Sequence, residues 1–273
     1  MEPERLQVAD VPDLLGLCKA AGWNQTEADW LRVMELDPEL CFGVRAGGKV
    51  VATAVAVTYE GGLAWIGMVL THPEQRGKGH ARALMTHLVD ELDRRGVTVQ
   101  KLDATDMGKP LYEQLGFAAE QPIERWKREA TKKPMKALGV VEPFRCDAEM
   151  DAEAFGWNRE RLLKVLAGSS DGAVTEGGYA MARPGTVATY FGPCVARTPW
   201  AAKRLVAWFL ARHGCEDVFW DLLPHNGEAQ ALARSLGFRP VRTLVRMARL
   251  VPGSVEHPRR DEYVYAIAGF EFG

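Results

Sequence analysis

The chain has 273 residues, of which 47% are hydrophobic and 26% charged, a composition typical of a globular protein with room for two medium-sized domains. A formal charge of −2 and a pI near 6.3, without any Lys/Arg-rich run carrying interleaved aromatic residues, argue against nucleic acid as a partner. No apolar run reaches membrane-spanning length and the N-terminus lacks a leader-peptide pattern, so we expect a cytoplasmic protein with no membrane contact.

No metal is expected either. The five cysteines form no CxxC pair, which indicates reduced and mostly buried thiols. His80 and His87 are two helical turns apart on one expected helix, about 10 Å along its axis, which is too far for a shared ion.

The first half of the chain alternates strand and helix patterns. Apolar runs predict strands over 6–8, 40–44, 50–59, 63–71, 97–103 and 123–128, and helical periodicity predicts helices over 11–21, 26–36, 79–95 and 110–116. The longest of these helices has an apolar face made by Ala83, Leu84, Leu88 and Leu92, so we expect it to lie on a sheet.

A glycine-rich turn, Gln75-Arg76-Gly77-Lys78-Gly79-His80-Ala81, joins the strand at 63–71 to that helix. Glycines let the backbone approach a ligand and turn its N–H groups outward, and the first turn of the helix adds unpaired donors and a positive dipole end. The turn is therefore predicted to bind a diphosphate, chiefly through the main chain.

After residue 130 the composition becomes polar, with Lys132, Lys133 and Pro134, and the apolar pattern then restarts. The restart predicts a domain over 1–130, a linker over 131–138 and a second domain over 139–273. Further elements are expected as a strand over 139–144, a helix over 159–166 and short strands broken by glycines.

The second half repeats the first at an offset of 121 residues. Leu115-Gly116-Phe117 falls on Leu236-Gly237-Phe238, and Arg76 falls on Arg197. The same offset places Thr198, Pro199 and Trp200 on the residues of the glycine turn, and Ala233 on Tyr112. Because proline has no N–H and tryptophan crowds the backbone, we expect a degenerate second copy that keeps the packing and lacks the anion-binding turn.

The ordered set of strand, glycine turn, helix, strand and Leu111-Tyr112-Glu113-Gln114-Leu115-Gly116-Phe117 resembles the GNAT superfamily of N-acetyltransferases, most clearly over residues 1–129. The tandem arrangement resembles bacterial two-domain GNAT proteins. The resemblance implies an α/β fold of the α+β type, with two tandem domains that each have a mixed, mostly antiparallel sheet flanked by helices. It also implies direct transfer of an acetyl group from acetyl-CoA to an amine.

The resemblance carries roles onto individual residues. Acetyl-CoA would be bound by Val69, Leu70, Thr71, Arg76, Gly77, Lys78, Gly79, His80, Ala81, Thr105 and Tyr112. Within this set, the backbone N–H of Val69 would polarise the thioester carbonyl, and the Tyr112 phenol would protonate the leaving thiolate. Thr105 replaces an asparagine that contacts the pantetheine arm in many relatives.

The general base stays open. Histone-type relatives carry a glutamate four residues before the acetyl-binding strand position, and that residue is Trp65 here. Glu60, Asp103, Asp106, His72 and a water chain ending on backbone carbonyls are the alternatives. The C-terminal segment 263–272 is expected to reach back to the cleft.

A small-molecule amine is the expected acceptor, set by the region 22–37, in which Trp23 is a pocket candidate while Trp30 and Met34 are expected in the core. Two alternatives are acetylation of protein lysines or N-termini, and a non-catalytic acyl-CoA sensor. The sequence leaves the oligomeric state open.

Overall fold

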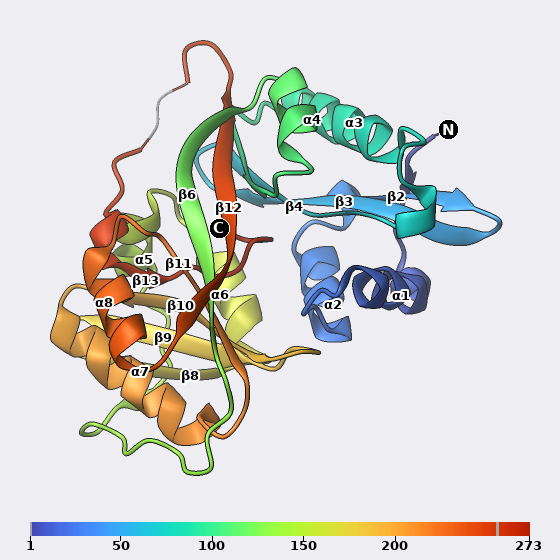
Figure 1. Ribbon diagram of the computed structural model, residues 1–273. Coiled ribbons are helices and arrows are strands. Elements are labelled where there is room, and N and C mark those ends of the chain that lie inside the picture. The colour runs from blue at the N-terminus through green and yellow to red at the C-terminus, as the bar shows by residue number, and fades with distance from the viewer. Residues whose placement is uncertain (1, 255–256) are drawn as a thin grey trace.

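In the computed structural model, which describes residues 2–254 and 257–273, the chain forms two lobes joined by one continuous sheet (Figure 1). The sheet runs in the order β1-β2-β3-β4-β5-β12-β6-β11-β10-β9-β8-β7, and β13 pairs with β10 beside this path. The strands of the first lobe are β1 (Glu4–Arg5), β2 (Cys41–Ala46), β3 (Lys49–Tyr59), β4 (Leu63–Thr71), β5 (Val99–Ala104) and β6 (Ala118–Arg128). The rest are β7 (Glu142–Pro143), β8 (Asp171–Thr175), β9 (Gly178–Arg183), β10 (Thr189–Ala196), β11 (Val218–Leu222), β12 (Arg239–Leu250) and β13 (Val264–Ala266).

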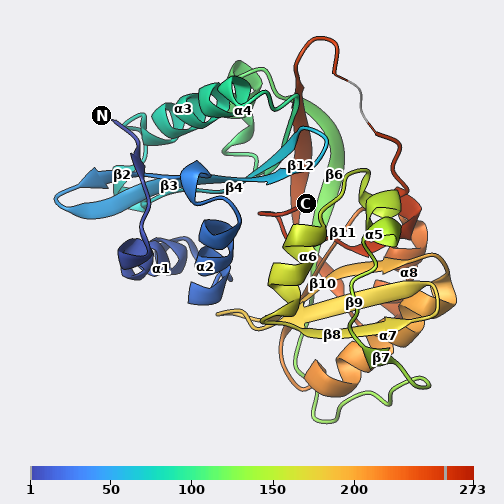
Figure 2. The same cartoon turned by 180° about the vertical axis from the view of Figure 1, so that it is seen from behind.

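In each lobe, helices cover both faces of the sheet. In the first, α1 (Val11–Ala21) and α2 (Glu27–Leu36) lie on one face, and α3 (His80–Arg94) and α4 (Lys109–Gln114) on the other (Figure 2). In the second, α5 (Ala148–Phe155) and α6 (Glu160–Ala167) oppose α7 (Pro199–His213) and α8 (Gly227–Ser235). Side chains from α1, α2, α5 and α6 share one hydrophobic core, so the two lobes are packed together. Among the described residues, no helix is both long and apolar enough to cross a membrane.

The predicted elements of the first half are present, with one error at the start of the chain. The strand expected over 6–8 is wrong: the strand is Glu4–Arg5, and a short 3-10 turn spans Val8–Asp10. In the second half, α5 was not predicted, because its eight residues alternate acidic and small side chains and present only a weak apolar face.

The internal repeat is visible in matching turns. Phe117 N–H donates to Tyr112 O and Phe238 N–H donates to Ala233 O, both at 3.0 Å, and each bond closes the end of its helix. The intervening Gly116 and Gly237 have φ of +87° and +85°, a conformation that glycine adopts without strain.

The two lobes exchange their last strands, which the sequence did not predict. Strand β12 of the second half lies between β5 and β6 of the first half, and β6 in turn pairs with β11 of the second half. In Figure 1 these two strands, β6 in green and β12 in orange-red, run side by side through the centre of the molecule.

A pair of buried ion pairs marks the exchange. Arg246 on β12 donates two hydrogen bonds to Asp103 on β5, at 2.9 and 3.1 Å. Arg125 on β6 does the same to Asp221 on β11, at 2.8 and 2.7 Å. In each case an arginine on the last strand of one half pairs with an aspartate on a strand of the other half, and the aspartate side chain is 0% exposed. The two arginines occupy matching positions of the internal repeat.

Replacing Arg246 with methionine should destabilise the whole chain by about 3–5 kcal/mol, because Asp103 would be left as a buried carboxylate without its cation. Urea unfolding followed by circular dichroism measures this loss. The double variant Arg246→Met with Asp103→Leu removes both charges and should recover most of the stability. A single variant as stable as the unmodified protein would show that the pair does not join the lobes.

Candidate active site

The site begins where β4 and β5 separate. The two strands are paired in parallel from Leu63 with Val99 to Ile66 with Leu102, and the pairing stops there, although β4 continues to Thr71. A register shift in the β3–β4 ladder and a positive φ of 49° at Met68 mark the same point. The opposite edge of β5 pairs with β12 along the whole strand, so beyond Leu102 only the edge that faces β4 is unpaired, and a wedge-shaped gap opens between β4 and β5.

Backbone N–H groups of β4 face this gap. His72 N–H donates to Val51 O on the β3 side, at 2.8 Å. Because successive residues of a strand direct their N–H groups to opposite edges, those of Thr71 and Val69 point away from β3 and toward the gap. This is the arrangement that the predicted polarisation of a thioester carbonyl requires.

A cavity of about 360 Å³ occupies the mouth of the gap. Its lining includes ten of the eleven predicted acetyl-CoA ligands: Val69, Leu70, Thr71, Arg76, Gly77, Gly79, His80, Ala81, Thr105 and Tyr112. Gly77 and Gly79 have φ of +76° and +84°, and apart from the adjacent chain neighbours no described residue has an atom within 4 Å of where a β carbon would stand on either glycine. Added side chains would therefore enter open space at this cavity.

Lys78 is the exception among the predicted ligands. Its side chain is exposed, does not line the cavity, and donates to Gln75 Oε1 at 2.8 Å. Gln75 and Arg82 do line it, as does Thr105, whose Oγ1 accepts from Gly108 N–H at 3.2 Å. In this conformation, the backbone N–H groups of the turn and the Arg76 side chain are the parts of the turn that can contact a ligand.

His80, the first residue of α3, is 4% exposed, and neither of its ring nitrogens has a hydrogen-bond partner among the described residues. Buried polar atoms without partners are rare in folded proteins. Together with the open glycine turn, these nitrogens fit a ligand with polar groups at the N-terminus of α3.

Tyr112, on α4, lines both this cavity and a second one. Its side chain packs so closely on Gly108 that a β carbon there would lie 2.7 Å from the ring. Burial raises the pKa of the phenol far above its usual value, so the group stays protonated at neutral pH. The hydroxyl makes no hydrogen bond to any described residue, and it is available as a donor.

The second cavity, of about 100 Å³, lies deeper along the gap. Its lining includes Val69, Asp103, Thr105 and Tyr112, which the sequence singled out, and Asn24 and Gln25 from the region 22–37 that was expected to set the acceptor. Three more polar residues that line it, Arg125, Arg242 and Glu271, were not singled out by the sequence. Trp23 lines both cavities, whereas Trp30 and Met34 are buried in the core, as expected. The C-terminal segment does reach the cleft, since Phe270 and Glu271 form one wall.

Of the four side chains considered as a base, only Asp103 lines a cavity. Its carboxylate already accepts two hydrogen bonds from Arg246. Glu60 and Asp106 are exposed outside both cavities, and the His72 ring accepts from the N–H of Glu74. Among the described residues, no group of three or more His, Cys, Asp or Glu side chains is placed to hold a metal ion.

The matching turn in the second lobe has a different structure. Thr198 caps α7 by accepting from Ala201 N–H, Pro199 is the first helical residue, and the Trp200 side chain is exposed. The Thr198 hydroxyl therefore accepts a hydrogen bond from a backbone N–H at the start of α7. At the start of α3 no side chain caps the helix in this way.

A strand pair separates beside a glycine turn, and a helix N-terminus and a phenol surround the gap; this is the arrangement that the resemblance to GNAT proteins predicted. Two family models match the chain: "Acetyltransferase (GNAT) family" over residues 10–117 and "Acetyltransferase (GNAT) domain" over residues 148–266. The chain belongs to the GNAT superfamily, with two GNAT domains in tandem, and is an acyltransferase of that type.

Relatives have the same architecture along most of the chain. The uncharacterized N-acetyltransferase YitH of Bacillus subtilis is 24% identical over 217 residues, which cover 74% of this chain and 75% of the relative. A putative acetyltransferase from Pyrococcus horikoshii superposes with a TM-score of 0.85 at 20% identity, covering 99% of this chain and 95% of the other. A GCN5-related N-acetyltransferase from Sphaerobacter thermophilus gives 0.69 at 18% identity, with coverage of 94% and 98%.

Proposed function

We propose that this protein transfers an acetyl group from acetyl-CoA to the primary amine of a small molecule. The observation that carries the proposal is the pair of adjoining cavities that share Val69, Thr105 and Tyr112. The outer cavity has the glycine turn and the unpaired His80 nitrogens for the diphosphate and pantetheine arm. The inner cavity has room for an acceptor of only a few heavy atoms.

Two of the shared residues, Val69 and Tyr112, have tasks in the transfer, together with Thr71 of the outer cavity. The N–H groups of Val69 and Thr71 polarise the thioester carbonyl, which stabilises the negative charge that develops on its oxygen. The amine nitrogen forms a bond to the carbonyl carbon, the carbon–sulfur bond breaks, and the Tyr112 hydroxyl gives its proton to the departing sulfur. Tyr112 then regains a proton from solvent, and the proton that the acceptor nitrogen loses as it becomes an amide is taken up by a base.

In this proposal the two halves divide the work. Residues 1–130 bind acetyl-CoA, residues 131–138 form the connection, and residues 139–273 complete the sheet and one wall of the acceptor cavity. The second lobe binds no acetyl-CoA, since its turn carries Pro199 and Trp200 in place of the glycines.

The near-neutral charge of the chain, a formal −2, offers no clear docking surface for a basic peptide, and this favours a small amine over a protein lysine or N-terminus, the second candidate. Calorimetric titration with acetyl-CoA, followed by turnover assays on a library of small amines and on lysine peptides, tests this choice. One binding site per chain and turnover of small amines are expected. Faster turnover of lysine peptides than of small amines would show that the acceptor is a protein. If acetyl-CoA does not bind, the whole proposal is wrong.

Replacing Tyr112 with phenylalanine separates the enzyme from a non-catalytic sensor. Because the hydroxyl donates to no described residue and is needed only by the leaving sulfur, kcat should fall about 10²-fold or more while the Kd for acetyl-CoA stays the same. Steady-state kinetics and calorimetry on the same preparation measure both. An unchanged kcat would show that the phenol does not serve as the acid.

A further inference from the structure

A carboxylate from the far end of the chain lies in the inner cavity. Glu271 follows β13 by five residues, is 4% exposed, and lines this cavity together with residues of β4 and β5. Carboxylates are almost never buried this fully in a protein unless they are paired or functional.

The first lobe fixes this segment at the point where β4 leaves β5. The Trp65 indole N–H donates to Phe270 O at 3.0 Å. Gly67 allows the close approach of the backbones, because a β carbon there would lie 2.6 Å from Glu271 Cα. Histone-type relatives carry a glutamate at the position of Trp65. In this chain Trp65 instead binds the C-terminal segment, and that segment places the carboxylate of Glu271 in the cavity.

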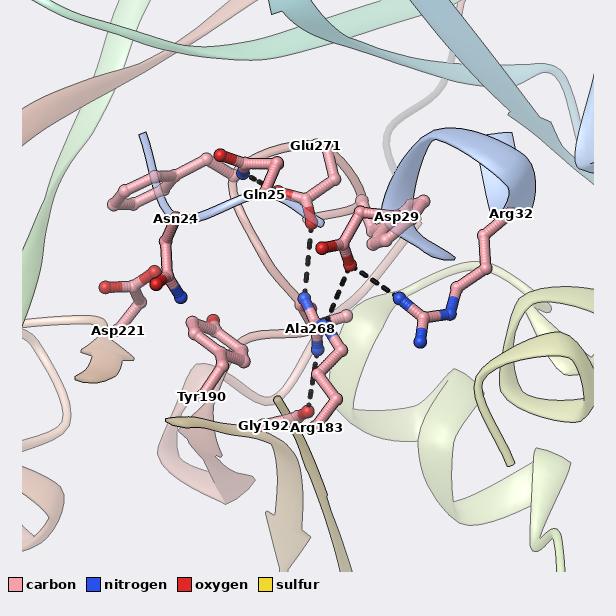
Figure 3. A network of polar contacts seen from close by, with 12 residues as sticks. Asn24, Gln25, Asp29, Arg32, Arg183, Tyr190, Gly192, Asp221, Ala268 and Glu271 are labelled. Carbon is pink, nitrogen blue, oxygen red and sulfur yellow. Dashed lines mark hydrogen bonds and ion pairs between the residues drawn. The ribbon is translucent and has the colours of Figure 1, made fainter. Parts of the chain in front are cut away.

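The charged surroundings of Glu271 are drawn in Figure 3. Arg183 on β9 donates to Glu271 Oε1 at 3.2 Å, and it is shared with Asp29 at 3.5 Å and with the carbonyl oxygens of Gly192 and Ala268. Asp29 is in turn paired with Arg32 at 2.5 Å. Among the described residues, the other side-chain contact of the carboxylate is a weak one, from Gln25 Nε2 to Oε2 at 3.5 Å, and the backbone N–H of Glu271 also donates to the carboxylate.

The charge balance around the carboxyl group disfavours its ionised form. Burial raises the pKa of Glu271, Arg183 lowers it, and Asp29 raises it again, with a net upward direction. Other charged or titratable groups face the site from neighbouring strands: Arg125 on β6, Tyr190 on β10 and Asp221 on β11. A carboxyl group whose pKa is moved toward neutrality is a better proton acceptor at cellular pH than an ordinary glutamate.

We propose that Glu271 is the general base of the transfer, supplied by the C-terminal segment in place of the usual glutamate on β4. The inference rests on the proposed function. Its carboxylate takes the proton from the acceptor nitrogen as the nitrogen–carbon bond forms, and it returns that proton to solvent after the product leaves. The Tyr112 proton goes to the sulfur, so one proton is accepted and one is donated in each turnover.

Glu271→Gln keeps the shape of the side chain and a hydrogen-bond acceptor for Arg183 while removing the base. The expected result is a kcat lower by about 10²–10⁴-fold, with an unchanged Kd for acetyl-CoA. Since the base must be deprotonated to act, kcat of the unmodified enzyme should fall as the pH drops through the pKa of Glu271, and this acidic limb should vanish in the variant. The matched control is Glu120→Gln, which removes a carboxylate paired with Lys101 that lines neither cavity.

A structural role would give different results. Loss of acetyl-CoA binding together with kcat, or equal losses of kcat in Glu271→Gln and Glu120→Gln, would overturn the inference. So would a variant that retains full turnover. If the unmodified protein acetylates no amine, the proposed function fails first, and a second measurement still decides the state of the carboxyl group.

That measurement is the carboxyl carbon resonance of Glu271 in the full chain labelled with ¹³C-glutamate, assigned by its absence in Glu271→Gln. We expect it to titrate clearly above the usual glutamate pKa of about 4.3. A resonance that keeps the ionised position down to about pH 4 would make Glu271 a permanent partner of Arg183 and would overturn the inference.

Discussion

Gly79→Trp is expected to lose acetyl-CoA binding entirely, with an affinity at least about 100-fold weaker in calorimetric titration. The position has φ of +84° and opens onto the outer cavity with nothing within 4 Å of a β carbon. An indole there would fill the space in which the diphosphate lies and would shield the N–H groups at the start of α3. The change also copies the residue that the second lobe carries at the repeat position.

A control variant tests whether backbone strain alone could cause the loss of binding. Gly48, in the turn between β2 and β3, has φ of +79° and equally open surroundings, but it lines neither cavity. Gly48→Trp therefore carries the same conformational cost, about 1–2 kcal/mol, and should bind acetyl-CoA normally. Normal binding by Gly79→Trp would mean that the ligand does not use the turn.

Residues 1–136 produced alone should give no folded acyltransferase. Without β12, strand β5 keeps only its four-residue pairing with β4, and β6 loses both of its neighbours. Open strand edges of this length associate with other chains rather than remain free. Co-expression with residues 137–273 should restore one soluble species that binds acetyl-CoA, because the two fragments can exchange strands as the intact chain does.

Size-exclusion chromatography and calorimetry on each fragment and on the pair measure this effect. The control is the full chain cleaved after folding at a protease site inserted at Lys136, in an exposed segment. The cleaved protein should keep its stability and binding. A monomeric fragment 1–136 that binds acetyl-CoA as tightly as the full chain would show that β12 is dispensable to the site.

The local part of the site was predictable because its signals lie close together in the sequence. The glycine turn, the start of α3 and the Leu111–Phe117 run all fall within about fifty residues, and each has its own pattern of glycine, apolar and aromatic residues. Strand pairing between the lobes was not predictable. The repeat gives both last strands an arginine at matching positions, Arg125 and Arg246, so the sequence is equally compatible with pairing inside each half.

Glu271 was missed for a different reason. It comes about two hundred residues after the strand it lies against, and its neighbours Phe270 and Phe272 show only an apolar tail. The one available signal was the tryptophan at position 65, where relatives have a glutamate. A missing acid of this kind points to a replacement elsewhere, and only the three-dimensional arrangement identifies which residue provides it.

The exchange of strands also determines when this protein can first become an enzyme. Strand β5 ends at residue 104, but its neighbour β12 begins only at residue 239, and Glu271 comes later still. At a translation rate of about 5–20 residues per second, the ribosome needs on the order of ten seconds to make the intervening chain. During that interval the nascent first lobe has an open sheet edge, which is a site for pairing with other chains until β12 has been made.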